Sequence, residues 1–189
     1  ASGITDSGTV TVGGNFSATT DANSGVINMG TMAVDGTFTL APNSTGAVTI
    51  VNDAGLNLAA STLGGTFSGT ATTGNITDSG ALAITGTTTL VTSANDATIA
   101  LDTTTNAFTG ALTITTNDAS GTDADVTIDG GTTALIIAAS TIDGDLTLTS
   151  GHASGITDSG TVTVGGNFAA TTDANSGVIN MGTMAVDGT

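Results

Sequence analysis

ASGITDSGTVTVGGNFSATTDANSGVINMGTMAVDGT, residues 1–37, decides the fold because the chain contains this stretch twice. It returns at residues 153–189, shifted by 152 positions, and the two copies differ only where Ser17 becomes Ala169. A fixed period of this kind is typical of repeat architectures, in which each unit is stabilised by stacking on its neighbours. We therefore interpret residues 1–152 as one full repeat and the second copy as the start of the next, within a longer array.

The composition favours strands and turns over helices. The 189 residues include 28 Gly, one Pro and 16 acidic residues, but no Lys, Arg or Cys. Every acidic residue is Asp; Asp, Gly, Thr and Asn are poor helix formers, whereas the missing Glu, Lys and Arg are good ones. Because 38% of the residues are hydrophobic, the chain can still form a core. The sequence therefore predicts an all-β fold.

The net charge of −16 argues against several classes of partner. Nucleic acids and anionic membrane surfaces attract cationic side chains, which this chain lacks. The longest apolar run, residues 134–139, is far shorter than the roughly 20 residues of a membrane span. We expect no nucleic-acid partner and no membrane span, but a surface that attracts divalent cations.

A shorter pattern, in which apolar residues stand two before, two after and four after a glycine, recurs inside the long repeat. It is centred on Gly14, Gly36, Gly65, Gly86, Gly110, Gly144 and Gly166. Alternate residues of a strand face opposite sides, so the apolar positions predict an inward core and the Ser and Thr residues between them an outward face. Each glycine predicts a bend between two short strands.

Aligned on these glycines, Phe16, Phe38 and Phe67 occupy equivalent positions in successive coils. Each coil carries a further short strand, and turn-forming clusters such as residues 21–25 and 42–46 lie between strands. Three strand segments per coil predict a parallel β-solenoid (β-helix). We expect right-handed coiling and about six coils per 152-residue repeat, which would advance roughly 29 Å. An antiparallel sandwich is the alternative, but the stacked like residues favour the solenoid.

Two stretches carry a family likeness, GNITDSGALAITGTTTLVTS (residues 74–93) and AASTIDGDLTLTSG (residues 138–151). They resemble the strand repeats of filamentous-haemagglutinin-like adhesins and related β-strand-repeat proteins, which are very large bacterial surface exoproteins. The likeness covers essentially the whole of residues 1–189, which we treat as a single continuous solenoid segment. The resemblance implies a right-handed β-helical shaft, export to the cell surface or beyond, and a part in adhesion or cell-to-cell contact.

Aspartates are the candidate site residues. Asp123, Asp125 and Asp129 form the densest group, and oxygen ligands at this spacing are suited to calcium in a turn. The chain lacks the EF-hand loop and the glycine-rich calcium nonapeptide, and Asp is also a common turn residue, so both interpretations stay open. Calcium is the one cofactor that the sequence suggests.

Three further aspartates, in the recurring sequence ITDSG, are expected to accept hydrogen bonds from backbone groups of turns. They are Asp6, Asp78 and Asp158. His152 is the only histidine, and without Cys or a second His it completes neither a zinc site nor a catalytic triad. We expect it on a solvent loop.

No motif predicts catalysis. A polysaccharide lyase would need Arg or Lys, which are absent, and a glycosidase needs two carboxylates across one cleft. Asp35 and Asp143 occupy equivalent, outward positions before their glycines, but four coils would place them roughly 19 Å apart. We expect that the protein is not an enzyme.

Outward threonines raise the alternative of ice binding. The ladder would be built from the pairs Thr37/Thr39, Thr66/Ser68 and Thr87/Thr89. Ala111 and Asp145 interrupt it in flanking coils, and Thr is favoured on exposed strands for packing reasons alone. Ice binding is therefore disfavoured.

The sequence as a whole predicts a structural shaft of an extracellular filament or giant surface adhesin. Its partners would be further copies of the repeat, in the same chain or stacked end to end, because neither end shows a polar cap. The alternative is a module that binds calcium or glycans on the side of the solenoid. Rods of uniform width would support the shaft, and saturable ligand binding by the segment would support the module.

Overall fold

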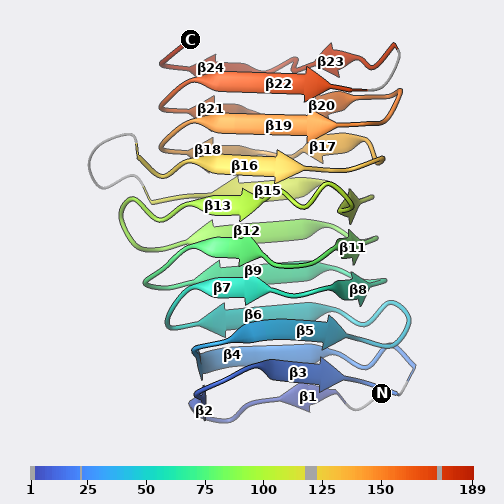
Figure 1. Ribbon diagram of the computed structural model, residues 1–189, viewed down its shortest axis with the longest axis vertical. Helices are drawn as coiled ribbons and strands as arrows, with labels where there is room; N and C mark the ends of the chain where they lie inside the picture. Colours follow the sequence, from blue (N-terminus) through green and yellow to red (C-terminus); the bar gives the residue numbers. More distant parts are fainter. Residues whose placement is uncertain (1–2, 22, 118–122, 174–175) are drawn as a thin grey trace.

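The structure is a computed structural model that describes residues 3–21, 23–117, 123–173 and 176–189, and it is a parallel β-solenoid (Figure 1). Its strand pairings are all parallel, and the described ranges contain no helix. In Figure 1 the chain rises from the N-terminus; near strands such as β5 (Thr37–Ala41) run left to right, and distant strands such as β6 (Val48–Asn52) run right to left. The coil is therefore right-handed.

In the part of the chain that the structure describes, the strands form three sheets along the solenoid axis. Sheet A contains β1 (Ile4–Thr5), β2 (Val10–Val12), β4 (Ile27–Val34), β6, β9 (Phe67–Ala71), β12 (Thr88–Thr92), β15 (Leu112–Thr115), β17 (Leu135–Ile137), β18 (Ser140–Ile142), β20 (Ile156–Asp158), β21 (Val162–Val164), β23 (Ile179–Asn180) and β24 (Met184–Val186). Sheet B contains β3 (Phe16–Thr19), β5, β7 (Leu56–Leu58), β10 (Ile76–Asp78), β13 (Ile99–Leu101), β16 (Val126–Asp129), β19 (Leu146–Ser150) and β22 (Phe168–Thr172). Sheet C contains β8 (Ser61–Leu63), β11 (Leu82–Ile84) and β14 (Ala107–Phe108).

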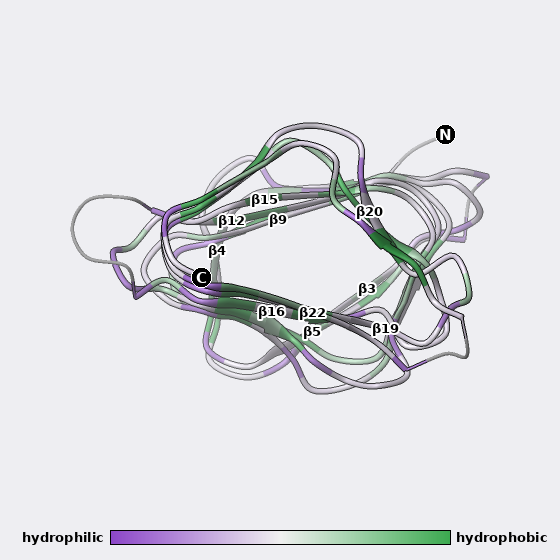
Figure 2. Cartoon of the chain, turned by 90° about the horizontal axis from the view of Figure 1, so that it is seen from above, coloured by the Kyte–Doolittle hydropathy of each residue, from purple (hydrophilic) through white to green (hydrophobic). Residues whose placement is uncertain are grey.

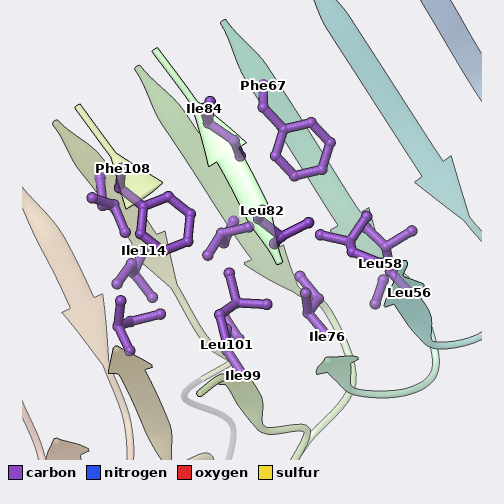
Figure 3. Close-up of a cluster of buried hydrophobic side chains, with 14 of the residues drawn as sticks. Leu56, Leu58, Phe67, Ile76, Leu82, Ile84, Ile99, Leu101, Phe108 and Ile114 are labelled. Atoms are coloured by element: carbon purple, nitrogen blue, oxygen red, sulfur yellow. The ribbon is translucent and has the colours of Figure 1, made fainter. Parts of the chain in front are cut away.

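The core fills the space between the sheets. Figure 2 shows the view along the axis, in which β9, β12 and β15 line one long side of a flattened cross-section and β5, β16 and β22 line the other. Side chains from all three sheets meet inside, as Figure 3 shows for Phe67, Ile84 and Leu101. These three are at most 2% exposed, so the predicted inward positions are confirmed in the inner coils.

The strand register gives seven coils per 152-residue repeat, so the predicted six is wrong. Successive partners along sheet A are Ile4, Ile27, Val48, Phe67, Thr88, Leu112 and Ile137. In the last of these coils Leu135 pairs with Ile156, which is the second copy of Ile4. The chain therefore makes seven coil-to-coil steps before its sequence starts again.

The miscount arises because the glycines do not all lie at the same corner. Gly14 and Gly36 each lead into sheet B, whereas Gly65 leads from sheet C into sheet A. Between Gly36 and Gly65 the chain forms β5, β6, β7 and β8, which is more than one turn. Phe16 does lie opposite Phe38, with ring centroids 5.7 Å apart, as predicted.

The predicted equivalence of Phe38 and Phe67 is wrong for the same reason. Phe38 lies opposite Leu58 in sheet B, and Phe67 lies between Val48 and Thr88 in sheet A. The glycine alignment is therefore correct within groups of neighbouring coils and fails where the corner changes.

Seven whole coils return the repeat to the same side of the solenoid. Ile4 and Ile156, which begin two copies of ITDSG, both lie in sheet A, and both pair with the same residue of the next coil, Ile27 or its copy Ile179. Ile76 begins the copy of ITDSG between them, and it lies in sheet B. The first 72 residues of the repeat therefore move the motif from sheet A to sheet B, and only the full 152 residues return it to sheet A.

Candidate functional site

The aspartates of ITDSG join neighbouring coils. The Asp6 carboxylate accepts hydrogen bonds from the backbone N–H of Gly30 at 3.0 Å, and from the N–H and hydroxyl of Thr31 at 2.7 and 2.6 Å. Asp158 does the same in the second copy, accepting from the N–H groups of Gly182 at 2.6 Å and Thr183 at 2.9 Å. The expectation that these carboxylates accept from backbone groups is confirmed, but the groups belong to the next coil, and those that Asp6 contacts lie in strand β4 rather than in a turn.

These hydrogen bonds stabilise the ionised carboxylates. The pKa of Asp6 lies below its usual value, chiefly because of the Thr31 hydroxyl and then the N–H of Gly30. The pKa of Asp158 is lowered mainly by the N–H of Gly182 and then by that of Thr183.

Asp78 makes the equivalent contact on sheet B. Its carboxylate accepts from the N–H of Asp102 at 3.3 Å and of Thr103 at 3.4 Å, and from the Asn106 side-chain amide at 2.6 Å. The Asn106 Oδ1 accepts in turn from the N–H of Leu82 at 2.8 Å. The aspartate of ITDSG therefore links neighbouring coils on sheet B as it does on sheet A.

A second set of coil-to-coil contacts was missed in the sequence. Asn15 Oδ1 accepts from the N–H of Thr37 at 3.0 Å, and its copy Asn167 accepts from that of Thr189 at 3.0 Å. Asp145 Oδ1 accepts likewise from the N–H of Asn167 at 2.6 Å. The signal was an Asn or Asp directly after a corner glycine, as in Gly14-Asn15 and Gly144-Asp145.

The three aspartates suggested as calcium ligands lie around β16. Asp123 is exposed and its carbonyl accepts from the N–H of Asp125 at 3.0 Å. The Asp125 carboxylate accepts from the N–H of Asp145 at 2.8 Å, and the Asp129 carboxylate from that of Gly131 at 2.7 Å. Within the described ranges no group of three or more His, Cys, Asp or Glu side chains is placed to hold a metal ion. Calcium binding stays a prediction, which a calorimetric titration would check.

His152 lies exposed on a turn, as expected, and its Nδ1 accepts from the N–H of Ser154 at 3.0 Å. It borders a shallow hollow of about 330 Å³ whose lining includes Phe108 and Ile136. No second titratable side chain lines this hollow in the described structure. The arrangement therefore offers His152 no partner for proton transfer there.

The aspartate pair considered for a glycosidase and the threonine ladder considered for ice binding both differ from expectation. Asp35 is exposed, but Asp143 is only 5% exposed and its N–H donates to the Thr116 hydroxyl at 2.8 Å, so its predicted outward position is wrong. The threonine pairs do not form one ladder either: Thr39 lies in sheet B, whereas Ser68 lies in sheet A.

None of the described segments is a helix that is long and apolar enough to span a membrane.

Comparison with known proteins identifies one family. The model for a family described as repeats of unknown function (DUF5649) matches residues 45–115 and residues 123–189, together more than half of the chain. No curated protein and no solved structure matches the chain. Both matched ranges include the sequence AAST, at residues 59–62 and 138–141.

Proposed function

The chain belongs to the DUF5649 family of repeats, and we propose that it is a structural shaft, without enzymatic activity, of an extracellular filament or giant surface adhesin. The observation that carries the proposal is the whole number of coils in the repeat. After seven coils the same residues meet the same neighbours, as Val12 meets Val34 and Val164 meets Val186. Each added repeat therefore adds length along one axis without rotating the surface.

Two kinds of contact support the use of this solenoid as a shaft. The buried core is continuous from coil to coil, because each inner coil packs on one coil below and one above. Aspartates such as Asp6 and Asp158 add charged hydrogen bonds between coils at the surface. A long array of such coils gains contacts in proportion to its length, whereas a single coil would not hold its shape.

The partners in this proposal are further copies of the repeat, in the same chain or end to end. The location is extracellular, at the cell surface. A net charge of −16 keeps neighbouring shafts apart in solution, since like charges repel and oppose lateral association. The absence of Cys makes the fold independent of the redox state of its surroundings.

Imaging of concatenated repeats tests the shaft. Chains with one, two and three copies of residues 1–152 are expected to form rods of constant width in electron micrographs. The length should rise by roughly 34 Å per copy, from seven coils at about 4.8 Å. Compact particles, or a length that does not increase in equal steps, would contradict the proposal. Antibody labelling of intact cells tests the location, and labelling only after permeabilisation would exclude the surface.

A further inference from the structure

Four successive strands of sheet A, β6, β9, β12 and β15, share an unbroken register. The register aligns one outward hydroxyl residue from each strand: Thr49, Ser68, Thr89 and Thr113. None of the three pairings shows a register shift. The strands are stacked one above another on the far side of Figure 1, and β9, β12 and β15 lie over one another in the axial view of Figure 2. Their outward side chains therefore form a regular, nearly flat array.

Two further ranks of outward residues flank this central one. The residues two positions further along the strands are also in register; they are Val51, Thr70, Val91 and Thr115. The residues just before the strands form the third rank; they are Ala47, Thr66, Thr87 and Ala111. Neighbouring strands are about 4.8 Å apart, and neighbouring ranks are roughly 6.7 Å apart along a strand. We call this array of outward residues in 47–51, 66–70, 87–91 and 111–115 the threonine face.

The threonine face is uncharged and offers free hydroxyl groups. The chain contains 16 aspartates, but none lies in the four segments of the face. The hydroxyls of the face have no hydrogen-bond partner within the part of the chain that the structure describes. Elsewhere hydroxyls bond to carbonyls of their own coil, as Thr92 does with Ala97 and Thr133 with Gly130. The hydroxyls of the face are therefore available to an external partner.

The shape and chemistry of the threonine face disfavour the usual classes of ligand. No outward side chain is larger than Thr or Val, so the face lacks the concave shape of a small-molecule site. It also lacks the Trp, Tyr and Arg anchors that dominate protein interfaces, and the cations that nucleic acids require. The partner that fits is flat, uncharged, capable of hydrogen bonding, and periodic in two directions. The surface of ice has these four properties, because its water molecules repeat in parallel rows.

We propose that the threonine face binds ice. In the bound state the hydroxyls exchange hydrogen bonds with water molecules of the ice surface, and the methyl groups of Thr and Val lie between the rows of water. Thr and Val are β-branched, so their χ1 angles are restricted before binding and little side-chain entropy is lost. This activity goes beyond the proposed shaft, because it needs only the four coils of the face.

The interruptions that disfavoured ice binding in the sequence do not break this face. Asp145 directly precedes β19, which belongs to sheet B on the other side of the core. Ala111 belongs to one outer rank only, and Thr113 and Thr115 continue the other two ranks in the same coil. The pairs Thr66/Ser68 and Thr87/Thr89 do lie on the face, whereas Thr37/Thr39 lies in sheet B.

Ice partitioning of the 189-residue chain tests the proposal. The chain, labelled at its N-terminal amine, is cooled around a cold probe on which ice grows slowly, and its concentrations in ice and in liquid are compared. We expect enrichment in the ice, and a thermal hysteresis in a nanolitre osmometer that rises with protein concentration. Exclusion of the natural chain from the ice, like that of an ordinary solute, would overturn the proposal.

Two matched tyrosine variants locate the activity. Thr89→Tyr places a bulky side chain in the middle of the face, which holds the neighbouring hydroxyls away from the ice, so most of the hysteresis should be lost. Thr127→Tyr makes the same change at a half-buried outward position of β16 in sheet B and should leave the hysteresis unchanged. Circular dichroism checks that both variants fold. Thr115→Tyr, at an exposed position of the face, replaces Thr89→Tyr if that variant does not fold. Equal hysteresis in folded face and sheet B variants would overturn the proposal.

Discussion

Thr88 is a buried core residue with a polar side chain. Its side chain is 1% exposed, and its Oγ1 has no hydrogen-bond partner in the described structure. It lies opposite Phe67 and Leu112, both apolar. A buried hydroxyl without a partner carries its desolvation cost uncompensated. We expect Thr88→Val to raise the free energy of unfolding by about 1–2 kcal/mol in urea denaturation.

Thr92 is the matched control for Thr88, since both lie in β12. It is 2% exposed, but its hydroxyl donates to the carbonyl of Ala97 at 3.1 Å. Thr92→Val removes that bond and leaves a carbonyl unpaired, so it should lower stability by about 1 kcal/mol. If Thr88→Val and Thr92→Val changed the free energy of unfolding in the same direction, the hydrogen bonding of the hydroxyl would not determine stability at these positions.

The aspartates of ITDSG make stability depend on pH in a known direction. Hydrogen bonds lower the pKa of Asp6 and Asp158 below 3.8, so the folded state binds protons less readily than the unfolded chain. The stability that they contribute is therefore present above about pH 4 and is lost as the pH falls through the folded-state pKa values. We expect the difference in Tm between the natural chain and an Asp6→Asn/Asp158→Asn variant to shrink steadily below pH 4.

Asp35 provides the comparison for this titration. It is exposed, and its carboxylate accepts no hydrogen bond from the part of the chain that the structure describes. Asp35→Asn removes one carboxylate charge, half of what the Asp6/Asp158 variant removes, without breaking a contact between coils. If its Tm difference followed the same pH curve as the Asp6/Asp158 variant, net charge rather than hydrogen bonding would explain the effect.

At the level of the elements, the corner glycines set how closely the coils approach. A Cβ added to Gly86 would lie 2.5 Å from the carbonyl carbon and oxygen of Gly65 in the coil below, a backbone contact that no side-chain movement relieves. Gly86→Ala should therefore lower the free energy of unfolding by at least about 1–3 kcal/mol. Gly8→Ala should be nearly neutral, because a Cβ at Gly8 meets nothing within 4 Å. Urea denaturation compares the two, and equal losses would refute the packing argument.

The strands of each coil were predictable where apolar residues alternate in the sequence with the same two-residue period as side chains that face the core. Alternation identified the inward residues, and strands such as β6 and β16 lie where short apolar segments alternate with turns. The coil count was not predictable from the glycines, because a glycine permits a bend at any corner and its spacing does not say which corner it occupies. The 29 residues from Gly36 to Gly65 look like one long coil, yet they contain four strands.

The polar contacts between elements were predictable only in part. The recurring Asp of ITDSG was expected to satisfy backbone groups, but a sequence cannot say that these groups lie 24 or 25 residues ahead, in the next coil. Asn52 is buried, and its side-chain amide pairs with the N–H and C=O of Val34 in the neighbouring coil. It was overlooked because an Asn at the end of the apolar run of β6 resembles the start of a turn. Its buried position depends on the register of two neighbouring coils, which only the folded structure specifies.

At the scale of the whole molecule, the period of the sequence and the period of the surface are the same length. The repeat consists of two unequal parts of 72 and 80 residues. The first part moves the ITDSG motif from sheet A to sheet B and the second returns it to sheet A, so neither part alone places a surface feature on the same face again. Their sum does, because it contains a whole number of coils. A ligand bound to one repeat would therefore recur on one face at every seventh coil.

A distance across one full repeat decides between seven coils and six. Ser17 in β3 and Ala169 in β22 occupy the same position of the repeat, both are exposed, and the chain has no native Cys to remove. Ser17→Cys/Ala169→Cys carrying two spin labels should give a mean separation of roughly 34 Å in pulsed electron paramagnetic resonance, from seven coils at about 4.8 Å. Six coils would give roughly 29 Å, a difference that the method resolves. A pair at Ser17 and Thr39, in adjacent coils, calibrates the label positions, because these two residues are direct partners across β3 and β5.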